Sequence, residues 1–327
     1  MIVDEATSVL ARQRALRGYR LPRQDVLSDV LDLIRLRGES IEVYETGEAQ
    51  SKAFEAGRAR FHFVERGAFR LDTATNDAAS LAAGDLVLLP GGCAHVLTMV
   101  NTPGSVFGSL PVPVDLQSST SGPFRVLTGS FQFESVSVGP LVAGLPDVMH
   151  LRAEASGTPE WQRAILRFMR LEASEPAPGA ALMISRLIDL LVIRSLREWA
   201  TTRPAHSGWL RGLGDVRLGR ALAAMHGEPA REWKLGELAK IAAMSRSHFA
   251  ERFTKVVGEP PLRYLARWRL SLAADLLRNG RVRISEAASV AGYGSDASFS
   301  RAFKACFGYS PGAMRDGGDS IRDMSSR

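Results

Sequence analysis

The chain has 327 residues, which is too long for one small domain and fits two. Apolar residues make up 45% of it and charged residues 23%, the ordinary composition of a soluble globular protein, so global disorder is excluded. Its two cysteines, Cys93 and Cys306, are too few for a disulfide-stapled secreted fold or for a four-cysteine zinc site.

The net charge of +6 is distributed unevenly. Residues 208–327 hold 20 Lys and Arg against 12 Asp and Glu, a net charge of +8, whereas residues 1–207 hold 21 against 23, a net charge of −2. A basic C-terminal half favours a polyanionic partner such as nucleic acid, although a basic surface can also serve solubility alone.

No targeting or membrane segment is expected. The first thirty residues mix charged side chains into the apolar positions, unlike a secretory signal peptide. The most apolar stretch, residues 181–199, is interrupted by charged residues, among them Arg186, Asp189, Arg194 and Arg197. We therefore expect a cytoplasmic protein with no membrane partner.

In chain order, an Arg-rich arm (1–24) precedes a helix over residues 26–36, with Gly38 as its stop. The apolar period then changes to short alternating runs separated by Gly, Asn, Asp and Pro. These runs are residues 41–43, 61–63, 69–71, 86–89, 96–99, 106–110 and 131–133. Such a series predicts a β-sandwich or barrel.

Helical spacing returns at Thr158, a candidate N-cap with Pro159 in the first turn, and Trp161, Ile165, Phe168, Met169 and Leu171 are expected to line this helix. The next helix, residues 182–199, is apolar nearly all round. It must be buried on more than one side, so it is either a homodimer interface or packed across the sheet. Residues 201–210 read as a linker.

From Asp215 onward the pattern is helical, and it contains a repeat. Residues 237–258 match residues 286–308: Ala239 and Ala242 correspond to Ala288 and Ala291, and the Phe249–Phe253 pair corresponds to Phe299–Phe303. Each copy has a small-residue helix, a short turn, and a capped second helix whose Phe pair faces inward, which are the parts of a helix-turn-helix. A plain helical bundle is the alternative. The duplication and the basic charge favour double-stranded DNA as the partner.

Residues 215–315 resemble the DNA-binding domain of AraC/XylS-family transcription regulators. The matches are a connecting helix with Arg269, Ala273, Leu276 and Leu277, and the segment from Gly292 to Pro311. The resemblance implies two helix-turn-helix units that enter successive major-groove segments. It implies these DNA-binding residues: Ser245, Arg246, Ser247, Glu251, Ser295, Asp296, Ser298, Arg301 and Lys304. Glu251 departs from the family, which often has Arg there; a carboxylate would accept from a cytosine amino group and repel phosphate.

Residues 84–95 resemble the second motif of the cupin jelly-roll through the spacing of Gly84, Pro90, Gly92 and His95. The first motif, around His62, is degraded, and two of the usual metal ligands are missing. His62, Cys93 and His95 are candidates for an effector or redox site. They are also candidate ligands for zinc or another divalent metal, with structural histidines and a buried thiol as the alternative. Cys306 is expected in the core.

These observations predict an α+β multidomain protein: a cupin-like β jelly-roll with flanking helices, then an all-α domain of two helix-turn-helix units. The expected boundaries are 1–24 (arm), 25–200 (sensing and dimerisation, helical over 158–200), 201–210 (linker), 211–316 (DNA-binding) and 317–327 (tail).

The predicted function is a non-enzymatic, sequence-specific transcription regulator that dimerises and senses a small effector or chemical stress, with RNA polymerase as a partner if it activates. The alternatives are a metal-dependent cupin enzyme on a DNA-tethering domain and an architectural DNA binder without an effector.

Overall fold

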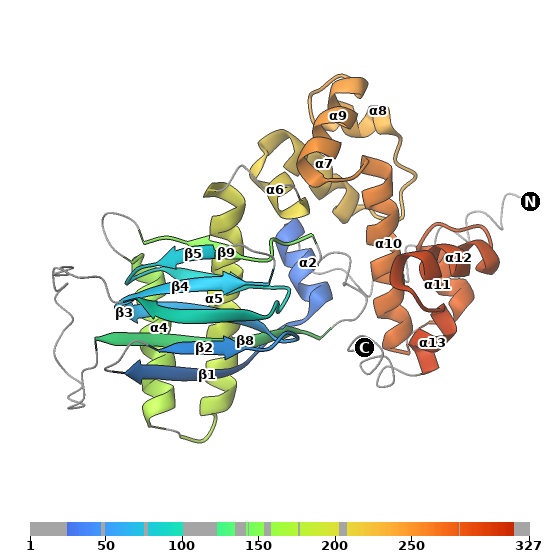
Figure 1. Ribbon diagram of the computed structural model, residues 1–327. Helices are drawn as coiled ribbons and strands as arrows, with labels where there is room; N and C mark the ends of the chain where they lie inside the picture. The colour runs from blue at the N-terminus through green and yellow to red at the C-terminus, as the bar shows by residue number, and fades with distance from the viewer. Residues whose placement is uncertain are drawn as a thin grey trace, which may run out of the picture. The chain divides into compact units, whose positions relative to one another are not determined.

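The computed structural model (Figure 1) divides into two compact units. The helical unit comprises residues 1–35, 133–145 and 200–327, and the barrel unit comprises residues 36–132 and 146–199. The structure describes residues 25–46, 50–74, 78–100, 123–134, 142, 144–153, 158–175, 177–202, 208–280 and 282–316. The predicted arm, the strand at 106–110, residues 203–207 of the linker and the tail therefore lie outside the described residues.

The barrel unit consists of two antiparallel sheets, which confirms the predicted jelly-roll architecture. The strands are β1 (Leu36–Thr46), β2 (Ser51–Phe54), β3 (Ala59–Arg66), β4 (Ala68–Thr73), β5 (Ala78–Leu81), β6 (Leu86–Leu89), β7 (His95–Val100), β8 (Phe124–Phe133) and β9 (Met149–Leu151). One sheet has the order β1-β8-β3-β6-β9 and the other β2-β7-β4-β5. The short strands β2, β5 and β9 were not predicted.

Helices α4 (Glu160–Ser174) and α5 (Ala180–Thr202) lie along the five-stranded sheet (Figure 1). Gly38 does not stop the first helix, as predicted, but lies inside β1, where the backbone meets α5. Its N–H donates to Asp189 Oδ1 at 2.8 Å, and its carbonyl accepts from Ser185 Oγ at 2.7 Å. A Cβ there would lie 2.5 Å from Ile188 Cβ, so only glycine permits this approach.

Two predictions about α4 are wrong. Its N-cap is Pro159 rather than Thr158, and no side chain caps it. Phe168 and Leu171 were expected on the buried face, but they are 54% and 40% exposed, while Ile165 and Met169 are buried. The apolar stripe of α4 is therefore wider than the surface of the sheet that it covers.

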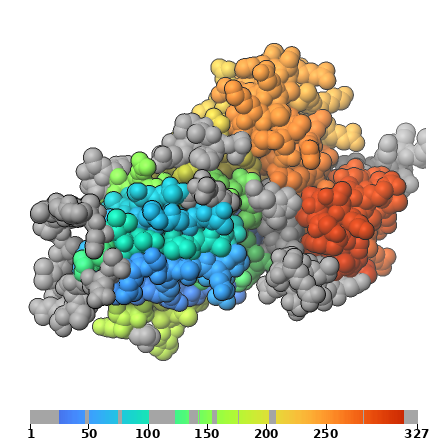
Figure 2. Space-filling model, viewed as in Figure 1, coloured from blue at the N-terminus to red at the C-terminus, as the bar shows by residue number. Residues whose placement is uncertain are grey.

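The helical unit contains two helical hairpins joined by one long helix. Its helices are α2 (Val26–Ile34), α6 (Trp209–Gly214), α7 (Val216–Gly227), α8 (Leu235–Ile241), α9 (Arg246–Val257), α10 (Pro261–Arg278), α11 (Ile284–Val290), α12 (Asp296–Phe307) and α13 (Pro311–Asp316). Figure 2 shows α11, α12 and α13 as one closely packed body. The helical pattern expected from Asp215 onward begins with Asp215 as the N-cap of α7, whereas α6 and α13 were not predicted. None of the described helices is long and apolar enough to span a membrane.

The predicted repeat is confirmed down to its hydrogen bonds. Glu237 accepts from the Lys234 N–H at 2.9 Å, and Glu286 accepts from the Arg283 N–H at 2.8 Å, so α8 and α11 begin with the same bond from a first-turn carboxylate to the backbone. The two Phe pairs are fully buried, and α10 contacts both α9 and α12. Each second helix thus turns one face to the core.

The helix α2 does not extend to residue 36. It ends at Ile34, because Arg35 adopts the left-handed conformation and Leu36 already begins β1. The sequence-based boundaries grouped α2 with the cupin-like domain, and in the structure it packs against α6, α7 and α10 of the helical unit.

The turns inside the two hairpins place different residues at their left-handed position. Ala243 and Gly292 occupy equivalent positions with φ of 52° and 79°, and each turn closes with a bond from the following N–H to the preceding helix. A left-handed conformation is strained for alanine and not for glycine.

Replacing Ala243 with Gly is expected to raise the free energy of unfolding of the helical unit by about 0.5–1 kcal/mol, because it removes this strain. Gly292→Ala is expected to lower it by about 1 kcal/mol. Urea unfolding of the full chain, followed by far-UV circular dichroism, measures both. Equal signs for the two substitutions would contradict the assigned turns.

Candidate nucleic-acid interface and effector site

The N-terminal ends of α9 and α12 are exposed on the helical unit. Ser245 and Ser295 cap the two helices, with side chains that accept from the N–H groups of His248 and Ser298. Both serines are exposed, but their hydroxyls already serve the caps. They start the two helices at equivalent points of the repeat.

The structure leaves most of the other predicted DNA-binding side chains facing solvent. The exposed ones are Arg246, Ser247, Glu251, Asp296, Arg301 and Lys304. Ser298 is partly buried, and its hydroxyl donates to the Ser295 carbonyl at 2.8 Å, so it belongs to the cap. The exposed set follows from the burial of the Phe pairs, since residues that flank a buried stripe must face outward.

Sequence analysis missed two side chains on α9. His248 is exposed in the first turn of the helix. Arg252 is held from α7, because Asp215 Oδ2 accepts from its Nε at 2.9 Å and from its Nη2 at 2.7 Å. The two bonds restrict a cation beside the exposed face of α9, and the pKa of the Asp215 carboxyl is lowered by hydrogen bonds from Leu218 and Arg252 that outweigh its desolvation. The pairing of residues 37 apart has no local sequence signal.

Arg269, one of the residues that carried the family resemblance, is structural. Its Nε donates to the Pro229 carbonyl and its Nη2 to the Arg231 carbonyl, both at 2.6 Å. Burial lowers the pKa of this guanidinium. Arg269 thus ties the loop between α7 and α8 to the connecting helix.

In the barrel unit, His62 and His95 meet between the two sheets. His62 is on β3 and His95 begins β7, and both are almost fully buried. Their Nε2 atoms lie 2.8 Å apart, and the Phe54 ring lies against both imidazoles with centroids 4.9 and 4.8 Å away. Both histidines point inward and form a histidine pair in the barrel interior.

The hydrogen bonds assign one protonation state to the histidine pair. His95 Nδ1 lies 2.8 Å from the Cys93 carbonyl, which only accepts, so Nδ1 carries the proton and Nε2 accepts. His62 must then donate from Nε2 and accept at Nδ1 from the Thr128 hydroxyl, 2.8 Å away. A second proton on His95 would place its Nε2–H against the Nε2–H of His62, whereas a second proton on His62 would lie on Nδ1 and require the Thr128 hydroxyl to accept instead of donate.

Electrostatics favour the same neutral state. Burial lowers the pKa of His62 well below its ordinary value, and the neighbouring His95, Arg60 and Lys52 lower it further. The pKa of His95 is also lowered by burial, opposed in part by its bond to the Cys93 carbonyl. A group that stays uncharged in the fold but titrates when unfolded makes stability depend on pH.

The described residues do not fit a metal centre. Among them, no group of three or more His, Cys, Asp and Glu side chains could hold a metal ion. Two imidazoles come together, but Cys93 is seen to join them through its backbone carbonyl, and a catalytic zinc needs three protein ligands. Cys93 is half-buried and packs against the barrel core, and Cys306 packs against the core between α10 and α12.

A cupin-like barrel followed by two helix-turn-helix hairpins on one connecting helix defines a DNA-binding transcription regulator with a ligand-sensing domain. A cupin family model matches residues 25–201, and a helix-turn-helix domain model matches residues 238–317. The chain belongs to the AraC family of helix-turn-helix transcription regulators.

Relatives that are described as transcription regulators match most of the chain. The HTH-type transcriptional regulator AlkR of Acinetobacter baylyi is 30% identical, over 88% of this chain and 97% of its own length. A putative AraC-like transcription regulator of Streptomyces antibioticus is 33% identical, over 89% and 98%. The RCS-specific HTH-type transcriptional activator RclR of Escherichia coli is 28% identical, over 81% and 86%. These likenesses do not favour the enzyme alternative.

Acidification is expected to destabilise the barrel unit through the histidine pair. The pKa of both histidines is lower in the fold than the unfolded value of about 6.5, so their contribution is present above pH 6.5 and is lost as pH falls below it. The free energy of unfolding should then fall by at most about 1.4 kcal/mol per pH unit for each histidine.

Amide exchange of β3 and β7 in the full chain at pH 7.5 and 5.5, corrected for intrinsic rates, measures this loss. His62→Gln should flatten the pH dependence, whereas His248→Gln, at the exposed histidine of α9, should leave it as in the wild type. An unchanged slope in His62→Gln would show that the pair does not carry the effect.

Proposed function

We propose that the chain recognises a two-part DNA site by placing the N-terminal ends of α9 and α12 in successive major-groove segments. One observation carries this proposal: two hairpins with the same caps and the same buried Phe pairs pack on one helix, and each leaves the start of its second helix exposed. The early residues of such a helix are those that reach base edges.

The exposed side chains differ between the two helices, so the two half-sites should differ. Arg301 on α12 can donate two hydrogen bonds to a guanine edge or bind a phosphate. Glu251 on α9 can accept from a cytosine amino group, and it weakens any nearby phosphate contact. Arg246 and Lys304 are the exposed cations that flank these positions.

Arg301→Ala tests the placement of α12. If Arg301 contacts a base, affinity for a duplex selected by the wild-type chain should fall by about 1–3 kcal/mol and specificity should relax at one position. If it contacts a phosphate, affinity for all DNA sequences should fall alike, and the slope of log affinity against log salt concentration should decrease in magnitude by about one.

The control is Arg58→Ala, which removes an exposed arginine from the barrel unit. Quantitative footprinting over a salt series distinguishes the cases. An unchanged footprint and affinity in Arg301→Ala would show that α12 does not read DNA in this orientation.

The effector is proposed to act in the barrel interior, at the histidine pair and Cys93. Hydrogen bonds run from the Thr128 hydroxyl through the histidine pair to the Cys93 carbonyl. A small molecule or a chemical stress that breaks this chain would alter both sheets, because His62 and His95 belong to different sheets. Any effector must favour one state of the protein over another to have an effect.

The active form is proposed to be a homodimer assembled through α4 and α5. Five large apolar side chains on these helices are at least 40% exposed: Phe168, Leu171, Leu182, Met183 and Leu190. Such a patch on two adjacent helices is typical of an isologous interface. In this proposal the dimer works in the cytoplasm, where it meets DNA and, if it activates, RNA polymerase.

Introducing charge into this patch tests the dimer. Met183→Glu and Leu190→Glu should each raise the dimer dissociation constant at least tenfold, about 1.4 kcal/mol, because a carboxylate would be desolvated at the interface. Val216→Glu, at an apolar residue 72% exposed on α7, is the control. Sedimentation equilibrium that gives the same mass for all variants would exclude α5 from the interface.

A further inference from the structure

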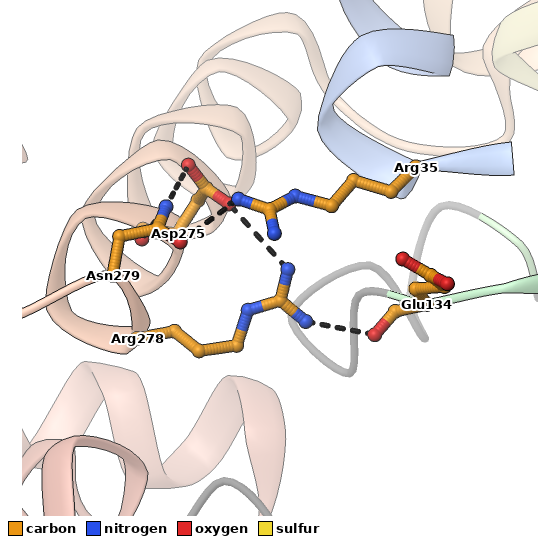
Figure 3. A network of polar contacts seen from close by, with 5 residues as sticks. All are labelled: Arg35, Glu134, Asp275, Arg278 and Asn279. Atoms are coloured by element: carbon orange, nitrogen blue, oxygen red, sulfur yellow. Dashed lines mark hydrogen bonds and ion pairs between the residues drawn. The ribbon is translucent and has the colours of Figure 1, made fainter.

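A closed polar ring binds the last turn of the connecting helix α10 to two segments that lie next to barrel strands in the sequence. Figure 3 shows its members: Arg35, Glu134, Asp275, Arg278 and Asn279. All five belong to the helical unit. Arg35 directly precedes β1, and Glu134 directly follows β8.

Asp275 is the centre of the ring. Its side chain is 1% exposed, and Arg35 Nη2 approaches its Oδ1 to 3.2 Å. Arg278 Nη2 lies 3.8 Å from the same oxygen, and Asn279 Nδ2 donates to Oδ2 at 3.0 Å. A buried carboxylate is stable only when cations and donors surround it, so loss of one arginine cannot be neutral.

The ring closes through the backbone. Arg278 Nη1 donates to the Glu134 carbonyl at 2.7 Å, and the Glu134 N–H donates to the Arg35 carbonyl at 3.3 Å. Arg35 Nη2 also donates to Asn279 Oδ1 at 2.9 Å. The segments before β1 and after β8 are thus bonded to each other and to α10.

Arg35 adopts a backbone conformation that a non-glycine residue takes only under constraint. Its φ is 50° and its ψ 61°, which ends α2 and lets β1 begin at the next residue. The side-chain bonds to Asp275 and Asn279 supply the constraint. Strain held by a specific contact points to a function for that contact.

A second polar contact joins α2 to the same helices. Asp29 Oδ2 lies 3.5 Å from Nδ1 of the buried His226 on α7, and His226 Nε2 lies 2.8 Å from the Tyr264 hydroxyl of α10. His226 also stacks on Trp268 of α10 with centroids 3.9 Å apart. Helix α2 is therefore linked to α10 directly through Arg35 at its C-terminal end and indirectly through Asp29 and His226 of α7.

We propose that Arg35 and Glu134 are positioning residues for DNA recognition, which couple the barrel strands β1 and β8 to the helix that joins the two helix-turn-helix hairpins. β1 and β8 are neighbours in one sheet, and Thr128 of β8 donates to His62 of the histidine pair. The coupling rests on the proposed function, and it requires that DNA binding and the state of the barrel influence each other equally.

The experiment is amide hydrogen exchange of the full chain with and without a duplex selected by the wild type. DNA should slow exchange in α9 and α12 and, through the ring, at least fivefold in β1 and β8. In Arg35→Gly, which removes the side chain but suits the left-handed backbone, α9 and α12 should still respond and the response of β1 and β8 should disappear.

Arg70→Ala is the matched control, since it removes another arginine–carboxylate pair, with Asp72 at 2.7 Å on β4. It should respond as the wild type does. A response of β1 and β8 that persists in Arg35→Gly, or that is missing from the wild type, would overturn the proposal.

A second arm needs no DNA and separates the coupling from the proposed function. His62→Gln should speed exchange in the last turn of α10 at least fivefold, and should add nothing in an Arg35→Gly background. Additive effects, or no effect of His62→Gln on α10, would overturn the coupling. Failure of the wild type to select any duplex would instead overturn the proposed function.

Discussion

The burial of one Phe pair on each second helix is the constraint on which the DNA-binding face depends. Phe249 and Phe253 on α9, and Phe299 and Phe303 on α12, have no exposed surface. Two rings four residues apart fix the rotation of a helix about its axis, because they must point into the same core. The opposite face of each helix, which carries cations and hydroxyls, must then face either solvent or a partner.

This constraint explains why the helical unit was predictable. The small residues of α8 and α11, the serine caps of α9 and α12 and the Phe pairs are local signals, and their duplication at a nearly constant offset strengthens each one. The barrel was predicted less completely. β2, β5 and β9 are only three or four residues long, too short for a period-two pattern to stand out.

The errors came from contacts between segments distant in sequence. Gly38 has the properties of a helix stop, but glycine is required at this position because α5, about 150 residues later in the chain, packs against its backbone. Phe168 and Leu171 fit the buried stripe of α4, but the sheet does not extend to cover them. The bonds of Arg252 to Asp215, and of Arg35 to Asp275, have no local signature, because side-chain pairing across a fold leaves no periodicity.

The barrel interior and the polar ring use buried polar groups in opposite ways. The histidine pair stays neutral, and each ring nitrogen has one partner, so a broken bond leaves a desolvated ring nitrogen unsatisfied. The ring instead keeps a buried carboxylate among two guanidinium groups and an amide. Replacing such a cluster by apolar residues would often be as stable, so stability alone does not explain it.

What the ring adds is a defined geometry. An apolar contact between α2 and α10 could slide by a fraction of a turn with little cost, whereas hydrogen bonds to Asp275, Asn279 and the Glu134 carbonyl permit one register. A helix that carries two DNA-reading hairpins transmits a small rotation to both. In the proposed coupling, a contact that specifies this register is what transmits a change in the neighbouring strands to both hairpins.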